Sequence, residues 1–114
     1  MVQAMLSIQV LPGKKNAAMD ILRSIQDSLQ LRHDLQVCKI YEAIGSEDEI
    51  LYLEQWQTRK GLHRHIQSDL YLRILEVMEL GLVPPKLSFQ ETSEAEGLEL
   101  VVGPPSLIRR GRRE

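Results

Sequence analysis

Apolar and polar side chains alternate along the first residues of the chain, which predicts a β-strand from Val2 to Leu11. Side chains two apart point to the same face of a strand, so one face is expected to be buried and the other to be open. The expected buried face is apolar throughout: Val2, Ala4, Leu6, Ile8 and Val10. Pro12 and Gly13 have turn chemistry and end this strand.

The apolar spacing then changes to three and four residues, which predicts an amphipathic helix over 14–31. Strand-like patterns return over 35–44 and 49–57, joined by a short polar turn at 45–48, as is typical of an antiparallel hairpin. The second of these strands carries apolar residues on both faces. Helices can cover only one face, so we expect the other to be covered by something else, such as a second copy of the sheet.

Two further helical segments and another strand follow. Thr58 is placed to cap a short helix that continues to about residue 67. Ser68 is placed to cap a second helix over 69–80, in which Leu75 belongs to the apolar stripe. Residues 86–91 alternate again and predict a fourth strand.

The predicted order is β-α-β-β-α-β, which is typical of the α+β class and of the ferredoxin-like split β-α-β arrangement with an antiparallel sheet. A chain of 114 residues suits one domain of this kind. We expect that domain to span residues 1–93. Residues 94–114 would form a C-terminal extension with a short strand at 98–102 and a basic tail.

The charge of the chain is unevenly distributed. The whole chain has 14 basic and 16 acidic side chains, and residues 109–114 hold four of the former and one of the latter. The remaining 108 residues therefore carry ten basic against fifteen acidic side chains, a balance of −5. Binding to phosphates requires a basic face, so this balance argues against nucleic acid as the main ligand.

The sequence favours a cytoplasmic protein without membrane attachment. No apolar run approaches the roughly 20 residues of a membrane-spanning helix. The first residues lack the basic segment of a signal peptide. Secreted domains of this size usually carry paired cysteines, whereas Cys38 is single. Because Cys38 sits in an apolar strand pattern, we interpret it as a buried structural thiol rather than a nucleophile.

The stretch 54–75 carries a distinctive set of residues, in the order Glu54, Trp56, Thr58, Leu62, His65, Ser68 and Tyr71. This stretch resembles the antibiotic-biosynthesis-monooxygenase family, whose third strand ends in a Glu-x-Trp-x-Ser/Thr pattern. In that family a helix follows with a His three residues before a Ser or Thr. Pro12-Gly13-Lys14 after the first strand also fits the family, and the resemblance extends from residue 1 to about 92.

This resemblance implies a homodimer in which two four-stranded sheets face each other as a dimeric α/β barrel. It also implies a cavity between sheet and helices in each subunit. Some members of the family oxygenate aromatic polyketides or quinols without metal or flavin. Others degrade heme, using an Asn on the first strand, a helical Trp and a His on the long helix. Here Asn16 is at the start of the first helix, Trp56 lies on a strand and 69–80 has no His, so we do not expect heme degradation. The resemblance to the oxygenating members implies a protein without a cofactor.

His65, Trp56 and Glu54 are the candidate catalytic residues. A neutral imidazole near pH 7 can accept a proton from a phenol or enol and so raise its reactivity toward oxygen. The alternative is a scaffold histidine that hydrogen-bonds the sheet or the next helix. Glu54 could be an acid–base group or a partner of Arg64, or else a satisfied core carboxylate.

Tyr52, Tyr71 and Arg64 are the candidate substrate-binding residues. Tyr52 shares a strand face with Trp56, and together they could form an aromatic wall for a flat substrate. Tyr71 could line the same pocket, and both tyrosines could equally be core residues. A metal site is not expected, because His63 and His65 are two residues apart on a helix and point away from each other.

The resemblance implies a cofactor-independent monooxygenase acting on a small electron-rich aromatic or quinol. Two alternatives remain open. One is a non-catalytic dimeric module that binds a small ligand. The other is an isomerase or processing enzyme for a small signalling metabolite, with His65 as the proton carrier.

Overall fold

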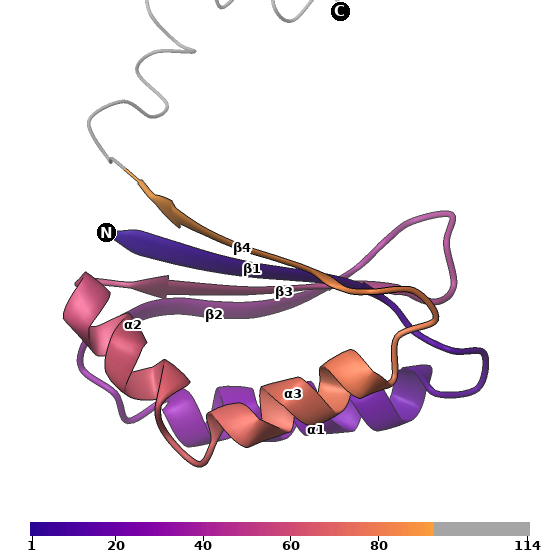
Figure 1. The fold of residues 1–114 in the computed structure, drawn as a ribbon, viewed down its shortest axis with the longest axis horizontal. Coiled ribbons are helices and arrows are strands. Elements are labelled where there is room, and N and C mark those ends of the chain that lie inside the picture. The colour runs from indigo at the N-terminus through magenta and orange to yellow at the C-terminus, as the bar shows by residue number, and fades with distance from the viewer. Residues whose placement is uncertain (93–114) are drawn as a thin grey trace, which may run out of the picture.

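The alternating segments of the chain pair into a single antiparallel sheet, with all three helices on one of its faces (Figure 1). A computed structural model describes residues 1–92. The strand order is β2-β3-β1-β4, which confirms the predicted α+β, ferredoxin-like arrangement. Along the chain the elements are β1 (Val2–Gln9), α1 (Lys15–Leu29), β2 (Leu35–Glu42), β3 (Glu49–Trp56), α2 (Arg59–Ile66), α3 (Tyr71–Glu79) and β4 (Lys86–Glu91).

The core lies between the sheet and the helices, and the two-residue period of the strands creates it. Along β1 and β3 every second side chain is buried against the helix layer. The intervening side chains face the other side of the sheet and stay partly exposed. Helix α1 contributes its apolar stripe to the same core, with Ala18, Met19, Leu22, Ile25 and Leu29 buried. The face of the sheet toward the helices is called the inner face below.

The pairing of β2 with β3 contains one irregularity. Leu35 lies opposite Trp56, but the register shifts before Val37. After the shift, Cys38 lies opposite Glu54, so Cys38 joins Leu35 on the inner face although the two are three residues apart. A regular strand would have placed them on opposite faces.

Several element boundaries differ from those predicted. β2 ends at Glu42, and Ile44 lies beyond it in the turn with its side chain fully exposed. The turn depends on Gly45, whose φ of 88° few other residues adopt. The predicted place of Leu75 in the apolar stripe of α3 is wrong, because that side chain is exposed while Ile74 and Val77 are buried.

The predicted capping role of Ser68 is also wrong. Helix α3 begins after Leu70 and has no side-chain cap. The Ser68 hydroxyl instead donates to the backbone oxygen of His65, 2.6 Å away, so it closes the C-terminal end of α2. Thr58 does cap α2 as predicted, accepting a hydrogen bond from the backbone N–H of Gly61 at 3.1 Å.

The outer face of the sheet carries no helix in the part of the chain that the structure describes (Figure 1). Met5, Leu51 and Leu53 lie on it and are partly exposed. A homodimer would cover these apolar side chains, and it stays a prediction. The predicted extension over 94–114, with its short strand at 98–102, lies outside the described residues.

Candidate functional site

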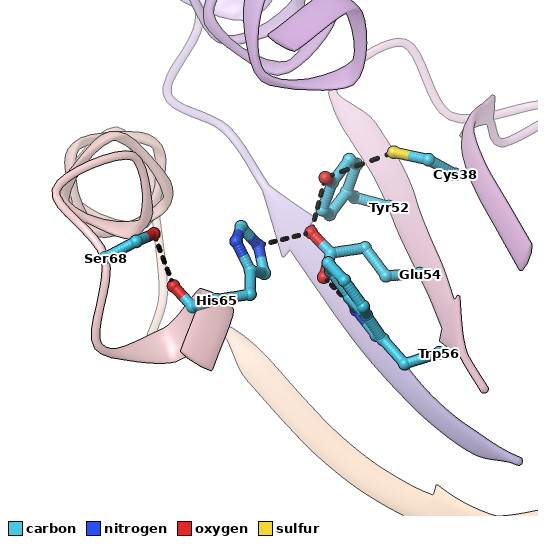
Figure 2. Close-up of polar contacts among 6 residues, drawn as sticks. All are labelled: Cys38, Tyr52, Glu54, Trp56, His65 and Ser68. Carbon is cyan, nitrogen blue, oxygen red and sulfur yellow. Dashed lines mark hydrogen bonds and ion pairs between the residues drawn. The ribbon is translucent and has the colours of Figure 1, made fainter. Parts of the chain in front are cut away.

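Three polar contacts converge on a buried carboxyl group in the middle of the inner face (Figure 2). Glu54 is only 2% exposed. Its Oε1 accepts from the indole Nε1–H of Trp56 at 2.9 Å. Its Oε2 accepts from the hydroxyl of Tyr52 at 2.6 Å and lies 3.0 Å from Nε2 of His65. A carboxyl group this deep is tolerated because its oxygens have such partners.

Strand β3 supplies three of these side chains through its period of two. Tyr52, Glu54 and Trp56 occupy alternate positions, so all three point to the inner face. The outer two side chains each donate a hydrogen bond to the carboxyl group between them. The sequence pattern Tyr-x-Glu-x-Trp thus builds most of the site locally.

Helix α2 supplies the fourth side chain. The Thr58 cap fixes the start of this helix just beyond β3, and His65 lies one to two turns further on, fully buried. Gly61 leaves room for the neighbouring Asp34 carboxylate, since a Cβ there would collide with Asp34 Oδ2. A larger residue at this position would require the Asp34 side chain to move.

The imidazole of His65 is held between two aromatic rings. It stacks on Trp56 with centroids 5.1 Å apart and meets Tyr71 edge to face at 5.3 Å. Its Nε2 faces Glu54, whereas Nδ1 is buried and has no hydrogen-bond partner among the described residues. On the other side of the group, the guanidinium of Arg32 lies 5.0 Å from the Trp56 ring centre.

Cys38 extends the group toward β2. Its thiol donates to the Tyr52 hydroxyl, with Sγ and Oη 3.3 Å apart (Figure 2). Burial raises the pKa of Cys38 to about 11, against the lowering effect of the Tyr52 hydrogen bond. Burial and the negative charge of Glu54 also raise the pKa of Tyr52 far above its ordinary value. At neutral pH both groups therefore keep their protons and act as donors.

A small pocket reaches this group from the side of β4. Its polar lining consists of Tyr52, Glu54 and Tyr71. The apolar lining comes from both sheet and helix, namely Ala4, Leu6, Ile74 and Leu87. Its free volume of about 10 Å³ suits roughly one water molecule. Burial, followed by the charge of Glu54, raises the pKa of the Tyr71 phenol as well.

Five of the six candidate residues come together here. Glu54, Trp56, His65, Tyr52 and Tyr71 all lie in or beside the group just described. The sixth, Arg64, is exposed on α2, so the predicted pairing of Glu54 with Arg64 is wrong. His65 contacts Glu54 instead, because it lies on the face of α2 that packs on the sheet.

The sequence did not predict the contact of Cys38 with Tyr52 or that of Arg32 with Trp56. Cys38 reaches Tyr52 only because of the register shift in β2, which leaves no clear mark in the sequence. Arg32 follows α1 in a turn, where residue type alone does not indicate an aromatic partner.

His63 and His65 differ sharply in their surroundings. His63 is exposed, whereas His65 is fully buried. Among residues 1–92, no three His, Cys, Asp or Glu side chains gather closely enough to hold a metal ion. No helix in this same range has the length and apolar character to cross a membrane.

Solved structures with the same arrangement of strands and helices include proteins of one functional class. An antibiotic biosynthesis monooxygenase superimposes with a TM-score of 0.72 at 8% identity, covering 82% of this chain and 99% of the other. A candidate antibiotic biosynthesis monooxygenase from Deinococcus radiodurans gives 0.75 at 16% identity, with 85% and 97% covered. A Mycobacterium tuberculosis protein gives 0.73 at 21% identity, with 83% and 98% covered.

These likenesses define the class of fold to which residues 1–92 belong. It is the ferredoxin-like α+β fold of antibiotic biosynthesis monooxygenases, and the resemblance seen in the sequence is confirmed at that level. No protein-family model matches the chain, and no curated protein matches it either. Sequence identities of 8–21% support a shared fold but not a shared activity. The activity has to be argued from the chemistry of the site.

Proposed function

We propose that the chain is a cofactor-independent monooxygenase acting on a small electron-rich aromatic or quinol substrate. One observation carries the proposal: a buried carboxyl group, hydrogen-bonded to a buried imidazole, lines a pocket between sheet and helices. A paired carboxyl and imidazole can accept a proton from a phenolic or enolic substrate. The resulting anion is rich in electrons, and it can react with dioxygen directly.

The reaction is balanced without a cofactor. With an anthrone, the methylene group loses two hydrogens and gains one oxygen atom as a carbonyl, while the second oxygen atom leaves as water. Glu54 and His65 would take up the first proton and return it to the departing oxygen. Tyr52 and Trp56 would hold the Glu54 carboxyl group in place, since each donates a hydrogen bond to it.

The small volume of the pocket sets a condition on this proposal. Space for about one water molecule accommodates a hydroxyl group but not a ring. The ring would lie outward, against Tyr71 and Leu87, and α3 would shift away from β4 to admit it. Arg64 has no role in this arrangement.

Oxygen uptake with anthrones and hydroquinones, measured with and without a chelator, tests the proposal. We expect oxygen uptake that depends on the substrate and persists in the presence of the chelator. The rate should fall at least about 100-fold in Glu54→Gln and in His65→Ala. His63→Ala is the matched control and should retain full activity, because its side chain is exposed on the same helix. Activity unchanged in both site variants would refute the assignment of these residues.

A non-catalytic ligand-binding module is the second candidate. The observation that favours it is the completeness of the Glu54 contacts, all of which are made by core side chains. Such a network can serve stability alone. A module of this kind would be stabilised by an aromatic ligand but would consume no oxygen.

We further propose a cytoplasmic homodimer. Met5, Leu51 and Leu53 on the helix-free outer face support the association of two sheets. The unpaired thiol of Cys38 suits a reducing compartment. Sedimentation of the full chain as a monomer at micromolar concentration would contradict the dimer.

A further inference from the structure

Within residues 1–92, the polar lining of the pocket beside Glu54 consists of acidic and phenolic groups. Glu54 provides a carboxyl group, and Tyr52 and Tyr71 provide hydroxyls. The pKa of each phenol is raised, so both remain uncharged at neutral pH. No Lys, Arg or His from this range lines the pocket. Glu54 is therefore the one side chain in this described lining that can carry a formal charge at neutral pH.

The hydrogen bonds of Glu54 leave one acceptor position open. A carboxylate has about four lone-pair sites on its two oxygens. Oε2 already contacts both Tyr52 and His65, whereas Oε1 accepts only from Trp56. The second lone pair of Oε1 can thus accept a hydrogen bond from a ligand. Glu54 also lines the pocket, whose free space fits about one oxygen atom and so matches a ligand hydroxyl.

The cationic groups near the site are directed elsewhere. The Arg32 guanidinium lies over the Trp56 ring and is paired with Asp34 at 3.2 Å. Arg59, nearer the end of β4, is paired with Glu91. His65 is fully buried and contacts Oε2 without lining the pocket. Among the described residues that line the pocket, an anionic ligand group would therefore meet the Glu54 carboxyl group and no basic side chain.

We propose that Glu54 sets the charge selectivity of this pocket: it accepts a hydrogen bond from the hydroxyl of a neutral aromatic ligand and excludes carboxylates and phosphate esters. This inference deepens the proposed function and rests on the same pocket. Like charges brought together away from water repel strongly, and their juxtaposition costs several kcal/mol at protein interfaces. Phosphorylated signalling metabolites would be poor ligands of such a site.

Binding of three probes that share one ring system tests the proposal. 1-Naphthol, 1-naphthoate and 1-naphthyl phosphate differ in the charge of one substituent, and their affinities for the full chain can be measured by calorimetry at pH 7. We expect 1-naphthol to bind at least about 30-fold more tightly than either anion, a difference of about 2 kcal/mol. In Glu54→Gln that ratio should fall at least about tenfold, because the amide keeps the shape and removes the charge.

Two further variants keep the test decisive if Glu54→Gln does not fold. Leu87 lines the outer part of the pocket and is partly exposed, so Leu87→Lys adds a cation at its mouth and should strengthen naphthoate binding. Glu91→Gln removes an exposed carboxylate outside the pocket lining and should leave the ratio unchanged. A wild-type protein that binds naphthoate as well as naphthol, or binds neither, would overturn the proposal, as would an unchanged ratio in Leu87→Lys.

The same experiment separates this inference from the proposed activity. Selective binding of naphthol without oxygen uptake from any anthrone or hydroquinone would refute the monooxygenase and leave the selectivity standing. Oxygen uptake together with equal binding of neutral and anionic probes would refute the charge selectivity and leave the monooxygenase proposal standing.

Discussion

The two edges of the sheet are built from similar strands but are covered very differently. β2 at one edge lies against α1, and the amide of Gln26 on that helix donates to the backbone oxygen of Cys38 at 2.8 Å. The inner-face residues of β2 are accordingly half-buried. Every residue of β4 at the other edge is exposed, including Leu87 and Phe89, which also point to the inner face.

This difference explains where a ligand can enter. Among the described residues, the pocket that Glu54 lines includes Leu87 of β4 and no residue of β2. A ligand that reaches Glu54 through this pocket would therefore come from the β4 edge. The carboxyl group thus lies between the buried core and the exposed β4 edge, where it makes three polar contacts and still lines the pocket.

Matched Leu→Ala substitutions on the two sides should give the largest contrast. Leu22 beneath the covered edge is 0% exposed, whereas Leu87 on the open edge is 39% exposed. We expect Leu22→Ala to lower the free energy of unfolding by about 4 kcal/mol and Leu87→Ala by about 1 kcal/mol or less. Urea denaturation measures both values. Equal losses would mean that β4 is covered in solution.

Removal of the imidazole should have the next largest effect. His65→Ala leaves a cavity beside Trp56 and takes one partner from Glu54, so we expect a loss of about 3 kcal/mol in unfolding free energy. His63→Ala, two residues away on the exposed side of α2, should change it by less than about 0.5 kcal/mol. A small loss in His65→Ala would argue against a stabilising role for the buried group.

The pH at which the Cys38 thiol ionises tests whether the β2 edge of the sheet is covered. Burial raises its pKa from an ordinary 9.0 to about 11 in the folded protein. The folded state therefore holds this proton more tightly than the unfolded state. Its contribution to stability is fully present below pH 9 and is lost as the pH rises toward 11.

Two measurements check the behaviour of Cys38. The rate of alkylation by iodoacetamide should still be rising at pH 10 in the folded protein, while it levels off earlier in urea. Cys38→Ala should also reduce the loss of unfolding free energy between pH 9 and 11, relative to the wild-type protein. Identical alkylation profiles for folded and unfolded chains would show that the β2 edge is open to solvent.

The smallest effect is expected at the end of β4. The side chains of Arg59 and Glu91 form an exposed ion pair that joins the start of α2 to this strand, and the Arg59 hydrogen bond lowers the pKa of Glu91. Water and salt screen such a pair, so Glu91→Gln should leave the urea midpoint within experimental scatter. A clear shift of that midpoint would indicate that the pair holds β4 in place.

The order of elements could be predicted from the sequence because each strand and helix shows its own period. The candidate site could be predicted from the sequence only in part. Tyr52, Glu54 and Trp56 share a face by simple alternation, which the sequence displays. Their contact with His65 depends on how α2 turns back onto the sheet, and residue spacing does not determine that angle.

The errors have similar physical origins. Ser68 has the chemistry of an N-cap, but α2 ends two residues earlier at Ile66, and the backbone oxygen of His65 in its last turn accepts the Ser68 hydroxyl. Arg64 has the right charge to pair with Glu54 but lies on the solvent side of α2. Propensity and charge describe what a residue can do, whereas packing decides which of those options it takes.

The register shift between Leu35 and Val37 has a consequence for how this strand can vary in length. The extra residue, Gln36, has no partner on β3. Deleting it would leave Leu35 opposite Trp56 and Cys38 opposite Glu54 in regular alternation, so Cys38 would keep its place on the inner face. Related chains that retain the site should therefore tolerate a single-residue gap at this position, whereas a single deletion later in β2 would turn the residues beyond it to the opposite face.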